Sequence, residues 1–192
     1  MYSHHMRLTI IRKIQILCRG KNYAEVMPQF QSVYDMVIGG ENLGKMLDCK
    51  QHKNCNCLEH SIAVAYFSLL IVNRFKIKCS RSRLLRGALL HDYHLSSRRG
   101  DDGSSFKHGF AHAKVALANA NAEFALDLIE QDTILHHMFP MNPIPPKYVE
   151  GVVVCIIDKM CAIYEATSSK PYSKLLKRIN RMSPRGMMPS GL

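Results

Sequence analysis

The chain has 192 residues, of which 47% are hydrophobic and 21% are charged, which excludes a disordered chain and is typical of about one folded domain. The formal net charge is +11, and the whole excess lies at the ends, because residues 1–21 and 170–192 carry basic but no acidic side chains. A neutral central region does not favour nucleic acid as the partner, since nucleic-acid-binding domains usually carry their charge on the folded surface.

The sequence also argues against a membrane span and a secretion signal. The longest nearly apolar run, residues 61–72, is shorter than the ~20 residues that a spanning helix needs. The N-terminal apolar stretch is interrupted by Arg12, Lys13 and Gln15 and has no small-residue cleavage site after it. Seven Cys at irregular spacing do not form the pattern of a disulfide framework. We therefore expect a protein of the reducing cytoplasm with no membrane contact.

Helical periodicity dominates the chain, and no segment shows the alternation of a half-buried strand. The pattern predicts helices over residues 8–19, 23–38, 58–75, 81–92, 113–124, 127–138 and 147–166. Residues 43–51 suit a short helical piece, and residues 172–180 suit a short basic helix. The apolar run 152–157 would also fit a buried strand, but its flanking periodicity favours helix. We predict an all-α bundle of six to eight helices.

Loops are predicted where polar, Gly, Ser or Pro residues cluster, at residues 53–57, 94–107 and 139–146. The last residues, 182–192, are expected to be disordered. The predicted organisation has N-terminal helices packing on the core in residues 1–40, a core domain in residues 41–168, and a basic helix with its tail in residues 169–192.

One segment of the central region is strongly basic. Residues 74–99 hold eight Lys and Arg but a single acidic residue, Asp92. Such a segment is typical of a solvated helix face, and it would also suit a rim that attracts an anionic substrate. The sequence leaves both interpretations open.

Ten His are many for this length, and some of them share a placement with two Asp. Four His and two Asp stand at a predicted helix end or on an apolar helix face: His60, His91, Asp92, His112, His137 and Asp158. Asp158 is the most informative, because a carboxylate on an apolar face costs several kcal/mol in desolvation unless a metal cation or a salt bridge compensates it. Imidazole and carboxylate are the ligands that Zn, Fe and Mn prefer.

A competing metal hypothesis uses cysteine. Three Cys and two His fall within twelve residues, at Cys49, His52, Cys55, Cys57 and His60. They could form a structural zinc site, although the spacing lacks a pair of Cys-x-x-Cys motifs. This site would take His60 away from the His/Asp set.

Five short segments, in this order, resemble the HD-domain superfamily of metal-dependent phosphohydrolases, and most of all its small stand-alone bacterial members. The segments are Glu-His at 59–60, Arg-Gly-Ala-Leu-Leu-His-Asp at 86–92, His-Gly-Phe-Ala-His at 108–112, His-Met-Phe-Pro at 137–140 and Asp-Lys at 158–159. The resemblance implies one or two divalent ions (Mn, Fe, Zn, Co, Ni or Mg) and a metal-activated water that cleaves a small phosphoester or a nucleotide.

By position, the resemblance implies a first metal held by His60, His91, Asp92 and Asp158. It implies that Asp92 bridges to a second metal held by His112 and His137, with His136 as the substitute for His137. Catalytic roles fall to Asp92, through the metals, and to Lys159 and His108. For Lys159 the alternative is a solvated lysine, and for His108 it is a loop residue.

The chain departs from the family pattern directly after the HD pair. Many relatives have Gly-Lys there, with the Lys on phosphate, whereas Tyr93 and His94 follow here. The phosphate contact must then come from elsewhere, with Lys159, Lys114, Arg86 and His108 as candidates. Two other functions stay open: a di-iron oxygenase of HD type and a non-catalytic metal-binding sensor. The oligomeric state is not indicated.

Overall fold

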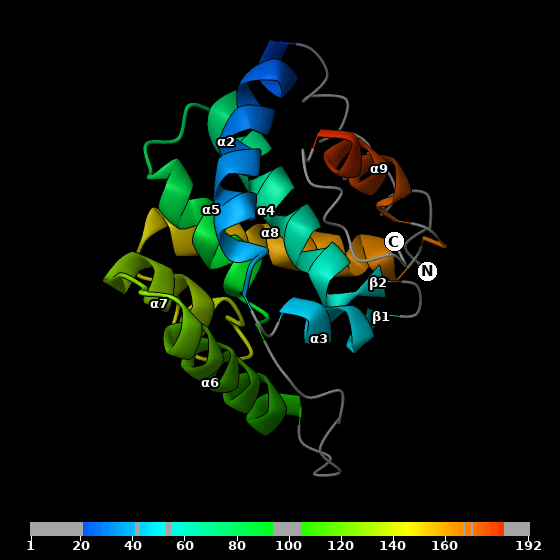
Figure 1. Cartoon of the computed structure of the whole chain (residues 1–192). Helices are drawn as coiled ribbons and strands as arrows, with labels where there is room; N and C mark the ends of the chain where they lie inside the picture. Colours follow the sequence, from blue (N-terminus) through cyan, green and yellow to red (C-terminus); the bar gives the residue numbers. More distant parts are fainter. Residues whose placement is uncertain are drawn as a thin grey trace, which may run out of the picture.

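The structure is a computed structural model that describes residues 21–40, 43–52, 55–93, 105–166, 168–169 and 171–182. Its helices are α2 (Lys21–Val37), α3 (Leu43–Asp48), α4 (Cys57–Arg74), α5 (Arg81–Leu90), α6 (Ser105–Glu123), α7 (Leu128–His136), α8 (Val149–Glu165) and α9 (Ser173–Met182). Two short antiparallel strands, β1 (Lys50–His52) and β2 (Cys55–Asn56), lie before α4 (Figure 1). The prediction of an all-α bundle is confirmed.

The central element is α4, which contacts α2, α3, α5 and α8 (Figure 1). Its sequence is apolar on nearly every side, and nearly all of its side chains are buried, as expected for a helix surrounded by others. A capping box starts α4: Asn56 Oδ1 accepts from the Glu59 amide at 2.8 Å, and Glu59 Oε2 accepts from the Asn56 amide at 3.1 Å. His60 lies in this first turn.

Close packing brings α5 and α7 together. A Cβ added to Gly87 would lie 2.8 Å from Cγ2 of Thr133, so only glycine allows this approach. The predicted N-cap of α7 is confirmed, because Asp127 Oδ1 accepts from the amides of Ile129 and Glu130, both at 2.9 Å.

Two predicted loops need correction, and some predicted segments lie outside the described residues. The predicted loop 53–57 is wrong in part, because Cys55 and Asn56 pair with β1 and Cys57 already begins α4. The predicted loop 94–107 is wrong at its end, because α6 begins at Ser105. The apolar run 152–157 is helical, as favoured. The predicted helix 8–19, the segment 94–104 and the tail from residue 183 lie outside the described residues.

Among the described helices, none combines the length and the apolarity that crossing a bilayer would require. The helix α2 packs against α4 and α5. The predicted domain boundaries stay predictions.

Candidate metal centre

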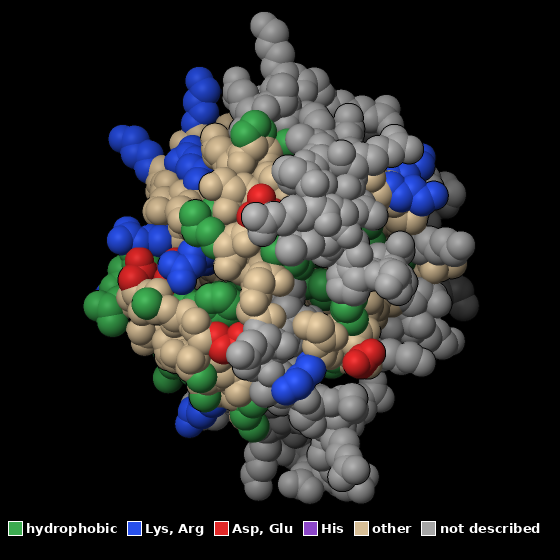
Figure 2. All heavy atoms as spheres, viewed as in Figure 1, with side chains coloured by type: hydrophobic (Ala, Val, Ile, Leu, Met, Phe, Trp, Pro, Cys, Tyr) green, Lys and Arg blue, Asp and Glu red, His purple; other side chains and the backbone are tan. Residues whose placement is uncertain are grey.

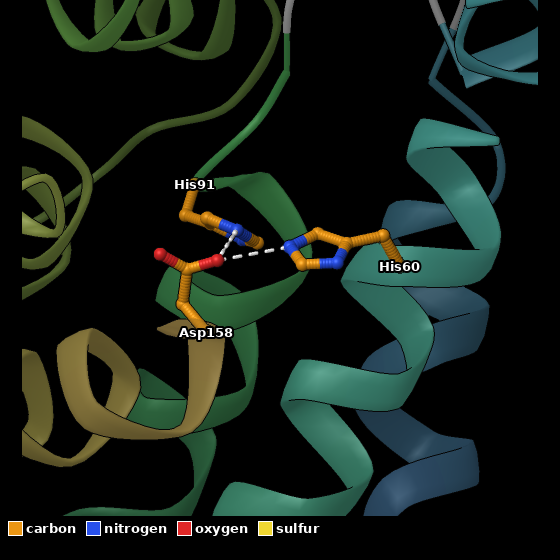
Figure 3. A group of neighbouring side chains, drawn as sticks. All are labelled: His60, His91 and Asp158. Carbon is orange, nitrogen blue, oxygen red and sulfur yellow. Dashed lines mark hydrogen bonds and ion pairs between the residues drawn. The ribbon is translucent and has the colours of Figure 1, made fainter. Parts of the chain in front are cut away.

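Three helices bring His60, His91 and Asp158 together in the interior (Figure 3). His60 lies in the first turn of α4, His91 follows the last residue of α5, and Asp158 lies near the middle of α8. Nε2 of His60 is 3.0 Å from Oδ1 of Asp158, and Nε2 of His91 is 3.8 Å from the same oxygen. All three are buried. The three side chains thus point their donor atoms at one place.

A second group of donor atoms adjoins the first and shares His91 with it. It consists of His91, Asp92 and His137. Oδ2 of Asp92 lies 3.6 Å from Nε2 of His91, and Oδ1 of Asp92 lies 3.5 Å from Nε2 of His137. In each group the donor atoms lie within 4.8 Å of one another. Ligands bound ~2.1 Å from one ion lie about 3–3.5 Å apart, so the spacing suits a shared cation.

Hydrogen bonds at Nδ1 fix the orientation of the imidazole rings of His91 and His137. Nδ1 of His91 donates to the carbonyl of Ala88, and Nδ1 of His137 donates to the carbonyl of Ile134, both at 2.7 Å. The two Nε2 atoms are buried and have no hydrogen-bond partner. Burial lowers the pKa of His137, so its Nε2 presents a lone pair. Metal-binding histidines are commonly held in this way.

The two carboxylates are ionised. Burial opposes this, but the imidazoles of His91 and His112 outweigh it and hold the pKa of Asp92 well below its ordinary value. The hydrogen bond from His60 and the nearby imidazole of His91 likewise outweigh burial and lower the pKa of Asp158. Asp92 Oδ1 faces the unprotonated Nε2 of His137 at 3.5 Å, and a divalent cation between them would remove the repulsion between their lone pairs. The donor set therefore fits a metal ion.

His112, from α6, reaches the same carboxylate. Its Nε2 lies 2.7 Å from Oδ1 of Asp92, although His112 is not a member of either three-residue group. His136, the substitute considered for His137, instead bonds Asp132 through Nδ1 at 2.8 Å. The structure therefore brings His137, and not His136, to Asp92.

The other predicted site residues lie in different surroundings. Nζ of Lys159 donates to the carbonyl of His137 at 2.7 Å and lies 3.7 Å from Oδ2 of Asp158, so this lysine does adjoin the centre. Arg86 is paired with Glu130 at 3.0 Å, in the contact between α5 and α7. Lys114 is exposed on α6, and the side chain of His108 lies outside the described residues.

The described part of the basic segment does not border the centre. Arg74, Lys76, Lys78 and Arg83 are exposed, and basic side chains gather over the connection from α4 to α5 (Figure 2). Arg74 ends α4 whereas His60 lies in its first turn, and a separation of 14 positions along the helix corresponds to ~21 Å. These side chains fit the interpretation as a solvated face.

The cysteine hypothesis finds no support in the described side chains. The candidate metal groups found there contain His and Asp alone. Burial raises the pKa of the Cys55 thiol, whereas a hydrogen bond with Cys57 lowers the pKa of Cys49 to about 7. His52 also belongs to that set of five residues, but its side chain is not among those that the structure describes.

Sequence reasoning missed one buried carboxylate beside the centre. Oε1 of Glu165 lies 2.7 Å from Nδ1 of His60, and both side chains are fully buried. A signal was available, because Glu165 follows Asp158 by seven residues, or about two helical turns, and so shares its face of α8.

Five helices, α4 to α8, thus bring His and Asp side chains together in a buried centre that could hold a metal ion, within a bundle that is almost entirely helical. The family model of the HD domain matches residues 57–163, more than half of the chain. The chain belongs to the HD-domain family. Neither the curated proteins nor the solved structures gave a match.

Proposed function

We propose that this protein is a metal-dependent phosphohydrolase that cleaves a small phosphoester, such as a nucleotide, with a metal-activated water. The position of Asp92 supports this proposal most directly. One of its oxygens lies 3.6 Å from Nε2 of His91, and the other lies 3.5 Å from Nε2 of His137 and 2.7 Å from Nε2 of His112. A carboxylate flanked in this way suits a bridge between two cations.

Each side chain has a role in this proposal. His60, His91 and Asp158 would hold one ion, and Asp92 would share it with a second ion beside His137 and His112. When bound, these ions would supply Lewis acidity and an activated water at neutral pH. The family is one of metal-dependent hydrolases, which agrees with this chemistry.

Lys159 is the best-placed cation for a substrate phosphate. Its side chain is 37% exposed, and its Nζ lies 3.7 Å from Oδ2 of Asp158. This ammonium group is therefore both accessible to solvent and adjacent to the centre. Its bond to the His137 carbonyl also fixes the chain segment that carries a metal ligand. A lysine in this position would take the role of the Gly-Lys that the family pattern has after the HD pair.

Elemental analysis of the purified protein tests the proposal first. We expect bound divalent metal, and then phosphate release from some member of a panel of nucleotides and sugar phosphates with Mn or Co added. Failure to bind any divalent metal would overturn the proposal. Bound iron with oxygen consumption would replace it with a di-iron oxygenase, and bound metal without turnover on a broad panel would indicate a metal-binding sensor. The cytoplasmic location and the small-molecule partner stay predictions.

A further inference from the structure

A chain of buried hydrogen bonds supports His60 from the side opposite to the candidate metal. Oε1 of Glu165 lies 2.7 Å from Nδ1 of His60 and 2.6 Å from the hydroxyl of Tyr172. Tyr172 is 3% exposed, and the side chains of Glu165 and His60 are fully buried. The three groups therefore meet in an environment without bulk water.

The direction of the two bonds follows from the chemistry of the groups. An ionised carboxylate only accepts hydrogen bonds, so the Tyr172 hydroxyl and Nδ1 of His60 both donate to the same oxygen of Glu165. When His60 binds a metal as a neutral ring with its proton on Nδ1, the lone pair of Nε2 is on the side of Asp158, whose Oδ1 lies 3.0 Å away. A carboxylate behind a histidine in this way fixes the tautomer and makes the ring a stronger ligand.

Tyr172 is itself held by the C-terminal part of the chain. Its ring packs against Phe67 of α4, with centroids 6.4 Å apart, and against Tyr164, with centroids 5.9 Å apart. Its carbonyl accepts from the amide of Leu176 in the first turn of α9 at 2.9 Å. Leu176 and Ile179 of α9 are buried. The helix α9 therefore anchors the tyrosine whose hydroxyl contacts Glu165.

Both supporting residues lie beyond the part of the chain that matches the family model, which ends at residue 163. We propose that Glu165 and Tyr172 are positioning residues for the metal centre, so that the segment from Glu165 to α9 sets the affinity of the first metal through His60. This inference rests on the proposed function, because it requires that His60 binds metal.

Cobalt binding to the full-length, metal-depleted protein tests the inference without any substrate. The dissociation constant of Co²⁺ is measured by chelator competition, and the ligand field is read from the visible absorption of the bound ion. We expect Glu165→Gln to bind Co²⁺ about 10- to 100-fold more weakly, with a changed spectrum. Tyr172→Phe removes the hydrogen bond to Glu165 and keeps the ring, so we expect about 2- to 12-fold weaker binding.

The matched control is Glu130→Gln. Glu130 is also a buried glutamate, at 2% exposure, but it pairs with Arg86 and caps α7. This variant should lose stability and keep the cobalt affinity and spectrum of the parent protein. If Glu165→Gln does not fold, Tyr172→Phe carries the test alone.

The outcomes separate the inference from the proposed function. Absence of Co²⁺ binding to the parent protein would overturn both. Binding by the parent, with the same affinity and spectrum in the Glu165→Gln and Tyr172→Phe variants, would overturn the inference and leave the proposed function standing. A loss of thermal stability without a change in cobalt affinity would also overturn the inference, since it would show a purely structural role.

Discussion

The rings of His91 and His137 meet edge to face, with centroids 4.9 Å apart and an angle of 83° between their planes. Each residue caps the C-terminus of a helix, His91 after α5 and His137 after α7. Each also donates Nδ1 to a carbonyl three residues earlier. The separation of the two helices therefore controls the distance between two candidate ligands.

Gly87→Ala should disturb this separation. The added Cβ would lie 2.8 Å from Thr133, so α5 and α7 must move apart, at a cost of about 1–3 kcal/mol of unfolding free energy. Metal affinity should fall as well, because the helices carry His91 and His137. Urea unfolding and metal titration measure both effects. Gly44→Ala is the control, because its Cβ would meet nothing within 4 Å. Equal behaviour of the two variants would contradict the prediction.

Removing either candidate carboxylate ligand should reduce the bound metal. Asp92→Ala should release all metal and abolish turnover, since Asp92 adjoins both groups of donors. Asp158→Ala should lose the first metal and some stability, because His60 and His91 lose the carboxylate they share. Metal content per chain checks both variants. Asp132→Asn offers a matched control, because Asp132 also bonds a histidine, His136, and should retain the metal of the parent protein.

Divalent metal should stabilise the metal-depleted protein against heat. Binding only to the folded state adds about 2.7 kcal/mol at a hundredfold excess of metal over its dissociation constant. For a chain of this size that corresponds to a rise of roughly 5–11 °C in melting temperature. Thermal scans with Mn, Co, Zn or Mg, and with a chelator added, measure the shift. A melting temperature that none of the four metals changes would contradict a preformed metal centre.

Cysteine substitutions should leave the metal in place. Cys55→Ser and Cys57→Ser change buried thiols, so we expect some loss of stability and an unchanged metal content in elemental analysis. Loss of metal from either variant would instead favour the zinc site of cysteines and histidines.

Asp127 should stabilise α7 in a pH-dependent way. Asp127→Ala removes the cap and should cost about 1 kcal/mol at neutral pH. Burial opposes ionisation, but the Glu130 amide and the ion pair with Arg83 outweigh it and hold the pKa of Asp127 below its ordinary value. The stabilisation that depends on this charge is therefore complete above that value and is lost as the pH falls through the lower folded pKa.

Urea unfolding of the parent protein and the Asp127→Ala variant at several pH values tests this dependence. The difference in unfolding free energy should shrink on the acid side of about pH 4. Asp127→Asn keeps a capping oxygen and loses the charge, so it should retain part of the cap at every pH. A difference that stays constant down to pH 2 would contradict the assignment.

The sequence predicted most of the side chains that meet in the candidate centre, because they stand where polar groups are rare. His60 and Asp158 interrupt apolar helix faces, and His91 with Asp92 ends another apolar helix. The helices themselves follow from their periodicity, and the Asp127 cap follows from its residue type. That these His and Asp side chains meet in one place was predicted from the resemblance to the HD-domain superfamily. Spacing along the chain could not predict it, since spacing does not fix how helices pack.

What the sequence did not predict depends on contacts between distant or very short segments. Glu165 meets a partner 105 residues away, and a single glutamate at a helix end is ordinary in sequence. The strands β1 and β2 are three and two residues long, which is too short for an alternating pattern to appear. Such features require the folded chain.

The capping box of Asn56 and Glu59 closes the turn of α4 that carries His60. Helix ends open more readily than helix centres, and a ligand in a terminal turn would leave with it. Fraying of this one turn would thus release an ion while the rest of the bundle stays folded. The residence time of a bound ion would in this way depend on the strength of two hydrogen bonds to the backbone, outside the donor set itself.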